Sequence, residues 1–144
     1  MTLRGACLCG AVVFEIDRIE GPFEICHCSR CRKVSGSTGM AAIEVSASEF
    51  RFVQGADHIG RYEAPLLHGP PAYVVPFCRT CGSPLPDPKA AGDSLEIPAG
   101  LLEDDPGIRP DKHIFVDFKA PWDDIGSEIP TFTMDEIRRH RRGD

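Results

Sequence analysis

We expect the topology of this chain to depend on two short motifs, Cys7-Leu8-Cys9-Gly10 and Cys78-Arg79-Thr80-Cys81-Gly82. Each motif offers two thiolates from one tight loop, and zinc takes four such ligands in a tetrahedron with zinc–sulfur distances of about 2.3 Å. A glycine after each thiol pair allows the backbone to turn sharply there. Because the motifs lie far apart in the sequence, one ion bound by both would fix strand ends that are distant along the chain.

The remaining thiols lie in a central segment, Cys26-His27-Cys28-Ser29-Arg30-Cys31. The seven cysteines divide into a closed site of four thiolates and a set of three, which is the ligand number of a catalytic zinc with one open position. The spacings alone leave open which cluster is the set of three. An odd number of cysteines without an export signal argues against a disulfide framework and favours metal or redox chemistry.

The surroundings of the central cluster favour thiolate chemistry there. We expect Cys31 in the first turn of a short helix, where free backbone N–H groups stabilise a thiolate. The neighbouring basic residues predict lowered thiol pKa values and a rim that attracts anions; they are Arg30, Arg32 and Lys33. Burial of the cysteines merely as small hydrophobic residues would not explain three clusters with such close spacing.

The length and composition are those of one ordinary domain, and we expect residues 1–144 to form it. The chain is 42% hydrophobic, but no apolar run reaches the roughly 18 residues of a membrane span. Residues 1–5 lack the apolar stretch of a secretory signal, so we expect a cytoplasmic protein. The formal net charge of −6 argues against nucleic-acid partners, and we interpret the basic run at residues 138–142 as a solvated helix end.

Short strands dominate the sequence pattern. The alternation of Val12, Phe14 and Ile16 predicts a half-buried strand at residues 11–17. We expect further strands at residues 23–26, 40–45, 50–53, 59–63, 73–78, 94–97 and 113–118. The 50–53 and 59–63 segments are predicted to pair with each other, and Pro76 places its strand at a sheet edge or bulge. Because the strands do not alternate regularly with helices, we predict a mainly β fold of antiparallel sheets.

Helical structure is expected in three short segments. Residues 29–36 fit a helix with Ser29 as N-cap and Gly36 as its C-terminal stop. Residues 46–49 carry the S-x-x-E pattern of a single helical turn. Residues 135–142 begin with acidic and end with basic side chains, as the helix dipole favours.

The chain resembles the glutathione-dependent formaldehyde-activating enzyme family over residues 3–133, which leaves residues 134–144 as a C-terminal helix and tail. The resemblance rests on the three cysteine motifs, on Ser35-Gly36 and Phe77, and on two late segments, His113-Ile114-Phe115-Val116-Asp117 and Lys119-Ala120-Pro121-Trp122. It implies a β-tent of short antiparallel strands pinned by a Cys₄ zinc, and the activity of a carbon–sulfur lyase.

The resemblance also implies two zinc ions and their ligands. A structural zinc would be held by Cys7, Cys9, Cys78 and Cys81. A second, catalytic zinc would be held by Cys26, Cys28 and Cys31, and a three-thiolate site of this kind loses metal or oxidises on handling, so partial occupancy is expected. The implied partners are a small-molecule thiol, glutathione or a similar one, and an aldehyde. The sequence specifies no oligomeric state.

Several other polar or aromatic residues are interpreted as structural. In an extended C-x-C the middle side chain points away from a shared metal, so we expect His27 to be a polar support and not a fourth ligand. His113 is expected to form a hydrogen bond at a strand end. Trp122 is interpreted as a packing anchor, and the acidic pairs Asp104-Asp105 and Asp123-Asp124 as solvated loop residues.

Three functions compete at this point. A three-thiolate zinc with an open position would bind a thiolate or polarise an aldehyde carbonyl, so that a thiol adds to the aldehyde or such an adduct is cleaved. The chain could instead be a non-catalytic zinc-binding module with only the Cys₄ site filled, or a thiol redox protein that uses Cys26, Cys28 and Cys31 without metal. Two zinc ions per chain would favour the enzyme, and one would leave the other two functions open.

Overall fold

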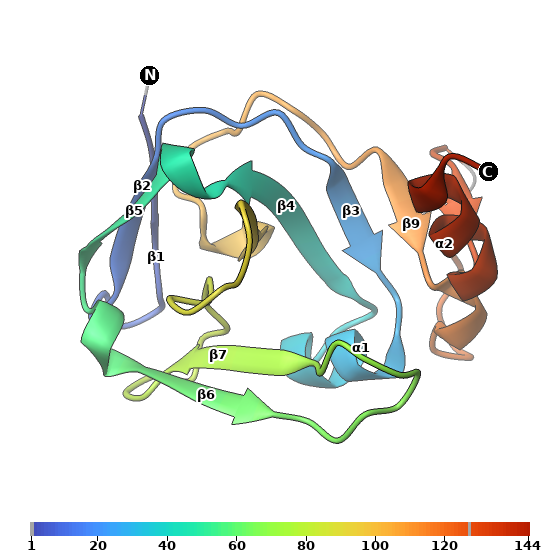
Figure 1. Cartoon of the computed structure of the whole chain (residues 1–144), viewed down its shortest axis with the longest axis horizontal. Helices are drawn as coiled ribbons and strands as arrows, with labels where there is room; N and C mark the ends of the chain where they lie inside the picture. Colours follow the sequence, from blue (N-terminus) through green and yellow to red (C-terminus); the bar gives the residue numbers. More distant parts are fainter. Residues whose placement is uncertain (1, 127) are drawn as a thin grey trace.

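The structure, a computed structural model, describes residues 2–126 and 128–144. These residues form ten β-strands, two α-helices and four 3-10 helices, and the strands lie in three sheets (Figure 1). The 3-10 helices connect strands at Ala47–Glu49, Ala56–His58, Ala99–Leu101 and Val116–Phe118. Five of the seven strand pairs in the described residues are antiparallel, so the predicted mainly β, antiparallel fold is confirmed.

The first sheet has the strand order β1-β2-β5, formed by Leu3–Ala6, Val13–Ile16 and Phe50–Gln54. The prediction that residues 50–53 pair with residues 59–63 is therefore wrong. β5 pairs with β2 because Phe50 and Phe52 lie opposite Ile16 and Phe14, where their rings join the core. The ring centroids of Phe14 and Phe50 are 5.4 Å apart, a favourable aromatic contact across this strand pair.

The second sheet has the order β10-β9-β3-β4-β8. Its strands are Thr131–Phe132, Lys112–Ile114, Phe23–Cys26, Met40–Ser46 and Ser94–Pro98. β9 runs parallel to both of its neighbours, while β4 is antiparallel to β3 and β8. The expected strand at residues 113–118 ends early, because the backbone of Phe115 is left-handed (φ 55°) and a 3-10 helix follows.

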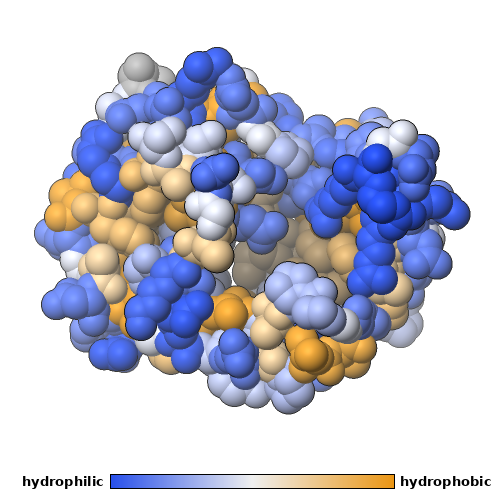
Figure 2. Space-filling view, in the orientation of Figure 1, coloured by the Kyte–Doolittle hydropathy of each residue, from blue (hydrophilic) through white to orange (hydrophobic). Residues whose placement is uncertain are grey.

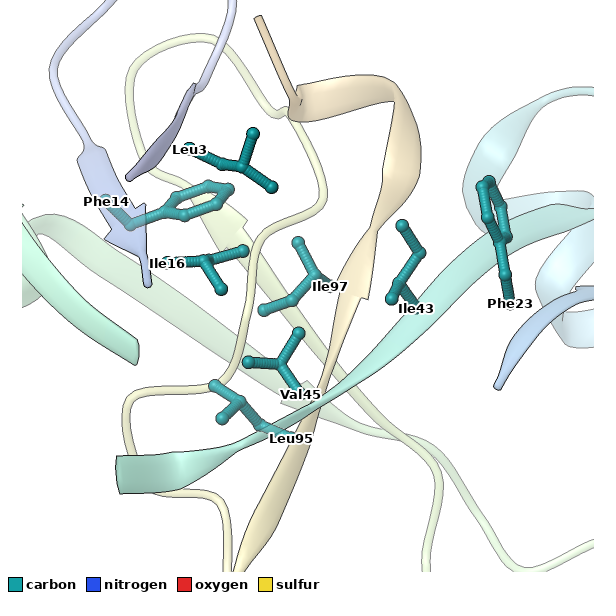
Figure 3. Close-up of a cluster of buried hydrophobic side chains, with 8 residues drawn as sticks. All are labelled: Leu3, Phe14, Ile16, Phe23, Ile43, Val45, Leu95 and Ile97. Carbon is teal, nitrogen blue, oxygen red and sulfur yellow. The ribbon is translucent and has the colours of Figure 1, made fainter. Parts of the chain in front are cut away.

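The core lies between one face of the second sheet and the first sheet. Ile43 and Val45 of β4 and Ile97 of β8 point toward Phe14 and Ile16 of β2 (Figure 3). All five side chains are at most 2% exposed. Because successive residues of a strand point to opposite faces, the other face of the second sheet presents Glu24, Cys26, Met40, Ala42, Glu44 and Glu96.

The third sheet is the antiparallel pair β6 (Ile59–Glu63) and β7 (Val74–Cys78). Pro76 lies within β7, and among the described residues β7 pairs with no second strand; beyond β6 it contacts the segment at residues 83–85 through an isolated bridge between Phe77 and Pro84 and through a hydrogen bond from the Leu85 amide to the Pro76 carbonyl. The edge position predicted from Pro76 is therefore confirmed. In Figure 1 this sheet lies across the molecule from β3 and β4.

The helices follow the expected segments with one correction. α1 spans Ser29–Ser35 and stops at Gly36 as predicted, where the backbone is left-handed, but its N-cap is Cys28 and not Ser29. α2 spans Met134–Arg142, begins with a capping box between Thr133 and Glu136, and lies beside β9 in Figure 1. Neither helix of the described chain has the length and apolarity needed to cross a bilayer.

Candidate functional site

The Cys7–Gly10 and Cys78–Gly82 motifs lie next to each other in the folded chain. The sulfurs of Cys7, Cys9, Cys78 and Cys81 all lie within 4.8 Å of one another. Two of the sulfur–sulfur distances, Cys7 to Cys9 and Cys9 to Cys78, are 3.7 Å. Four sulfurs at about 2.3 Å around a tetrahedral zinc are separated by about 3.8 Å, so this cluster has the dimensions of a four-thiolate zinc site. All seven cysteines are free thiols, so no disulfide competes for these sulfurs.

Neighbouring polar groups stabilise thiolates in this four-thiol cluster. The amide of Val12 donates a hydrogen bond to the Cys7 sulfur at 3.3 Å, and Ser83 lies 3.2 Å from the Cys81 sulfur. Hydrogen bonds from the hydroxyl and amide of Ser83 lower the pKa of Cys81 to about 5. A metal ligand must be deprotonated, so these bonds favour metal binding.

The two glycines of the motifs turn the chain as predicted. Gly10 and Gly82 have φ values of +79° and +78°, which favour glycine. Their N–H groups donate to the carbonyls of Cys7 and Cys78 and close the turns there.

The central motif forms a second cluster. Cys26 is the last residue of β3, paired with Met40 of β4 and Ile114 of β9, so its side chain is fixed by strands on both sides. Cys28 then caps α1, and Cys31 lies in the first turn of the helix. These three sulfurs also lie within 4.8 Å of one another, close enough to share one metal ion.

The three thiols of the central cluster divide their protons unequally. Hydrogen bonds from Cys26 and Cys31, together with the backbone N–H groups of the first helical turn, lower the pKa of Cys28 to about 2. The same contact with Cys28, followed by the hydrogen bond with Cys31 and then by burial, raises the pKa of Cys26. A hydrogen bond with Cys26 lowers the pKa of Cys31, but Cys28 and burial outweigh it and raise that pKa to about 12. Of the three thiols, Cys28 is the one whose surroundings favour the thiolate.

The central cluster opens into a cavity of about 1010 Å³, and the four-thiol cluster does not. The cavity lies between the polar face of the second sheet and β7, and Figure 2 shows the molecule hollowed near the centre of that view. Its wall includes Cys26, Cys28 and Cys31. This volume is at the upper end of the roughly 300–1,000 Å³ found for small-molecule sites.

Charged side chains line the cavity beyond the sulfurs. Glu24, two residues before Cys26, lies 3.4 Å from Lys112 of β9 and 3.0 Å from Arg141 of α2. Both Glu24 and Lys112 are largely buried, with 14% and 15% of their side chains exposed. The C-terminal helix thus contributes a charged residue to the cavity wall, which the sequence interpretation of residues 138–142 did not anticipate.

An aromatic residue touches the central cluster directly. The Tyr73 hydroxyl donates a hydrogen bond to the Cys31 sulfur at 3.4 Å, and the Arg30 guanidinium lies 4.8 Å from the centre of the Tyr73 ring. Burial, and then the electrostatic interaction with the neighbouring Cys31 sulfur, raise the pKa of Tyr73, so that its hydroxyl stays a donor. Of the three basic residues expected at the rim, only Arg30 lines the cavity. Arg32 instead donates to the carbonyl of Phe118.

Comparison with known proteins places the chain in a family. The family model described as glutathione-dependent formaldehyde-activating enzyme matches residues 2–118. The chain belongs to this family. A Halomonas elongata protein whose name places it with the glutathione-dependent formaldehyde-activating enzymes is 32% identical over 130 residues, 88% of this chain and 83% of that protein.

A solved structure shares the fold. The crystal structure of a Rhodobacter sphaeroides protein superposes with a TM-score of 0.54 at 24% identity, covering 89% of this chain and 98% of the other. The match to the family model contains all seven cysteines, Arg30 and Tyr73, whereas α2, with Arg141, lies outside it. The Arg141 side of the cavity is therefore contributed by a segment beyond the matched region of the glutathione-dependent formaldehyde-activating enzyme family.

His27 is a buried support, as expected, and is no part of either thiol cluster. It is 2% exposed. Its Nδ1–H donates to the carbonyl of Thr38 at 3.1 Å, which leaves Nε2 to accept from His113 Nδ1–H at 2.8 Å. Burial lowers the pKa of both histidines, which favours their neutral forms. This pair fixes the loop between Cys26 and Cys28 from the side opposite the cavity.

Two interpretations of single residues are wrong. Trp122 is 73% exposed and anchors no packing. Asp123, expected to be solvated, has a buried Oδ2 that lies 3.5 Å from His27 Nδ1 and has no hydrogen-bond partner among the described residues. The sequence carried no signal for either, because both depend on how the segment after the 3-10 helix Val116–Phe118 folds back.

Glu44 and Glu96 lie directly opposite each other on β4 and β8, on the face that lines the cavity. Burial against the cavity walls, followed by the negative charges of Glu24 and Glu44, raises the pKa of Glu96 although Arg141 acts in the opposite direction. Like charges on directly opposed residues destabilise a sheet by about 0.2–1 kcal/mol. We therefore expect Glu96→Gln to raise the free energy of unfolding by about this amount at pH 7.5.

The stability gained in Glu96→Gln should be larger at high pH than at low pH. The pKa of Glu96 is higher in the folded chain than the ordinary glutamate value of 4.5, so the folded state binds the proton more readily than the unfolded state does. The destabilisation caused by the Glu96 charge therefore disappears as pH falls through the folded pKa. Denaturant unfolding in zinc-containing buffer at pH 7.5 and 5.5 should show the difference between Glu96→Gln and wild type shrinking at the lower pH. The exposed Glu63→Gln is the control. A difference independent of pH would contradict the prediction.

Proposed function

We propose that this chain is a zinc-dependent carbon–sulfur lyase of the glutathione-dependent formaldehyde-activating type. One observation carries the proposal: of two thiol clusters with metal-binding dimensions, only the three-thiol cluster lines the large cavity. A closed four-thiolate site suits structure, and three thiolates facing a cavity leave a coordination position for a reactant. The family membership supports the same reaction.

The proposed roles follow the two clusters. Cys7, Cys9, Cys78 and Cys81 hold a structural zinc that joins the end of β1 to the end of β7. Cys26, Cys28 and Cys31 hold a catalytic zinc, which would supply a Lewis-acidic position for a thiolate or a carbonyl oxygen. The geometry supports this, because the three sulfurs lie within 4.8 Å of one another and line the cavity.

The reaction needs little more than two reactants held together. The sulfur of a thiolate attacks the carbonyl carbon of the aldehyde, a C–S bond forms, and the carbonyl oxygen takes up a proton to give an S-hydroxyalkyl adduct. The reverse reaction cleaves the same bond. The cavity walls hold the thiol beside the cysteines and limit the water around it, which favours addition through proximity. The volume of about 1010 Å³ accommodates a peptide-sized thiol together with a small aldehyde.

Small molecules are the proposed partners, and the cytoplasm the proposed location. Two of the four arginines at the basic end of α2 form ion pairs, Arg141 with Glu24 and Arg142 with Asp144, which reduces the positive charge that this end offers to nucleic acid. The formal net charge of −6 supports the same conclusion.

The proposal is tested by metal analysis and by a rate. We expect about two zinc ions per chain in protein purified without chelator. Exchange NMR with ¹³C-formaldehyde and glutathione should show faster interconversion of free aldehyde and S-hydroxymethyl adduct than in the same mixture without protein. Two zinc ions without acceleration of any thiol–aldehyde pair would overturn the catalytic role.

The same measurement separates the two alternatives. One zinc per chain with reduced, unreactive central thiols would indicate a non-catalytic zinc-binding module. One zinc per chain with reversible oxidation of Cys26, Cys28 and Cys31 would indicate a thiol redox protein. Thiol counting under reducing and oxidising conditions distinguishes these outcomes.

A further inference from the structure

Tyr73 forms a hydrogen bond to Cys31, one of the three sulfurs that line the cavity. Tyr73 enters the cavity from the segment that leads into β7, whereas Cys31 comes from α1 on the other side. Its hydroxyl is 3.4 Å from the Cys31 sulfur and donates to it. A hydrogen bond to a thiolate withdraws negative charge from the sulfur, and three thiolates around one divalent ion carry an excess charge of −1 that such a donor reduces.

The ring of Tyr73 makes a second contact, with Arg30. The Arg30 guanidinium lies over this ring with its central carbon 4.8 Å from the ring centre, within the range of a cation–π contact. Among the described residues Arg30 pairs with no carboxylate, unlike Arg141, which is held by Glu24. Its charge is therefore available to a ligand, one tyrosine ring away from the Cys31 sulfur.

We propose that Tyr73 is a positioning residue of the three-thiol centre and that Arg30 is the carboxylate-recognising residue which it holds in place. The hydroxyl reduces the charge on Cys31, and the ring fixes the guanidinium where the carboxylate of an incoming thiol lies. The inference deepens the proposed function and rests on it in one respect, namely that a thiol is the ligand. It restricts the preferred thiols to those that carry a carboxylate.

The two roles of Tyr73 are separable by substitution. Tyr73→Phe removes the hydroxyl and keeps the ring, so the sulfur of Cys31 becomes more electron-rich while Arg30 stays in place. Tyr73→Leu removes both. Arg30→Gln removes the charge and leaves the hydrogen bond to sulfur intact, and Arg30→Lys restores the charge without the planar fork that binds carboxylates in a bidentate manner.

The first test uses cobalt in place of zinc and needs no substrate. Sulfur-to-cobalt charge-transfer bands report the electron density of the thiolates, so Tyr73→Phe should shift these bands to lower energy, whereas Arg30→Gln should leave them unchanged. Tyr62, the other tyrosine of the chain, is exposed on β6, and Tyr62→Phe is the matched control. Bands of Tyr73→Phe that coincide with those of wild type would overturn the role of the hydroxyl.

The second test measures binding to the zinc-loaded protein by calorimetry, with glutathione as the carboxylate-bearing thiol and 2-mercaptoethanol as the neutral one. Loss of one charge-assisted contact should lower the affinity for glutathione about tenfold in Arg30→Gln and in Tyr73→Leu. Arg30→Lys should restore part of this loss. The affinity for 2-mercaptoethanol should not change, and the exposed Lys33→Gln on the same helix should affect neither thiol.

The outcomes keep this inference apart from the proposed function. Equal weakening of both thiols in Arg30→Gln would overturn carboxylate recognition, as would unchanged glutathione affinity. Far-UV circular dichroism and metal content show whether each variant is folded and loaded, and Tyr73→Phe keeps the packing if Tyr73→Leu does not. If wild type binds glutathione selectively but accelerates no thiol–aldehyde reaction, the proposed reaction fails and the recognition stands.

Discussion

Cys78→Ser is expected to give insoluble or unfolded protein, because it removes a ligand from the site that holds the two ends of the fold together. Cys78 is 1% exposed and lies among the sulfurs that join the N-terminal motif to the end of β7. A structural zinc contributes on the order of 10 kcal/mol to folding, which is comparable with the whole stability of a domain this size. The yield of soluble protein, its zinc content and its circular dichroism measure the effect.

A matched control lies in the same turn. Arg79 is exposed, and its side chain makes no ion pair among the described residues, so Arg79→Ala should fold with unchanged metal content. A Cys78→Ser protein that folds normally and keeps two zinc ions would show that this cluster is not a structural metal site.

Cys28→Ser is expected to leave the fold intact while it removes the second metal and the activity. Cys28 is half-buried at the cavity and holds no distant strands together. Serine is a preferred N-cap, so it preserves the start of α1 that Cys28 now caps. Loss of outer-shell partners of a metal already costs about 10–100-fold in affinity or activity, and loss of a ligand should cost at least that much.

Metal analysis should find about one zinc per chain in this variant, with circular dichroism and thermal stability close to those of wild type. Ser29→Ala, in the same helical turn, is the control, since the Ser29 side chain does not cap the helix. Full activity in Cys28→Ser would refute the catalytic role of the three-thiol cluster. If Cys28→Ser unfolded while Cys78→Ser folded, the three-thiol cluster would be the structural site and the four-thiol cluster the catalytic one.

Local patterns in the sequence predicted those parts of the fold that depend on neighbouring residues. The alternation around Phe14, the stop at Gly36 and the start of α2 are of this kind, and the structure places them within a residue or two of the expected positions. β1 was missed because its four residues, Leu3–Ala6, include a glycine and an arginine and show no strand pattern on their own.

Features set by distant contacts could not be predicted in this way. The partner of β5 was misassigned because the packing of Phe50 and Phe52 against the core, and not proximity along the chain, selects it. In the candidate site, spacing identified all seven cysteines as candidate metal ligands. Tyr73 and Arg141 were missed, because their segments approach the cavity only after β7 and α2 have packed.

The two thiol clusters occupy very different lengths of chain, from residue 26 to 31 in one case and from residue 7 to 81 in the other. During synthesis the central hexapeptide leaves the ribosome as a complete ligand set, while Cys7 and Cys9 must wait for about seventy more residues before Cys78 appears. A metal ion available to the nascent chain therefore meets the three-thiol cluster first. Correct loading requires that Cys7 and Cys9 remain unoccupied until then, so scarce zinc should fill the three-thiol cluster early in synthesis and the four-thiol cluster late.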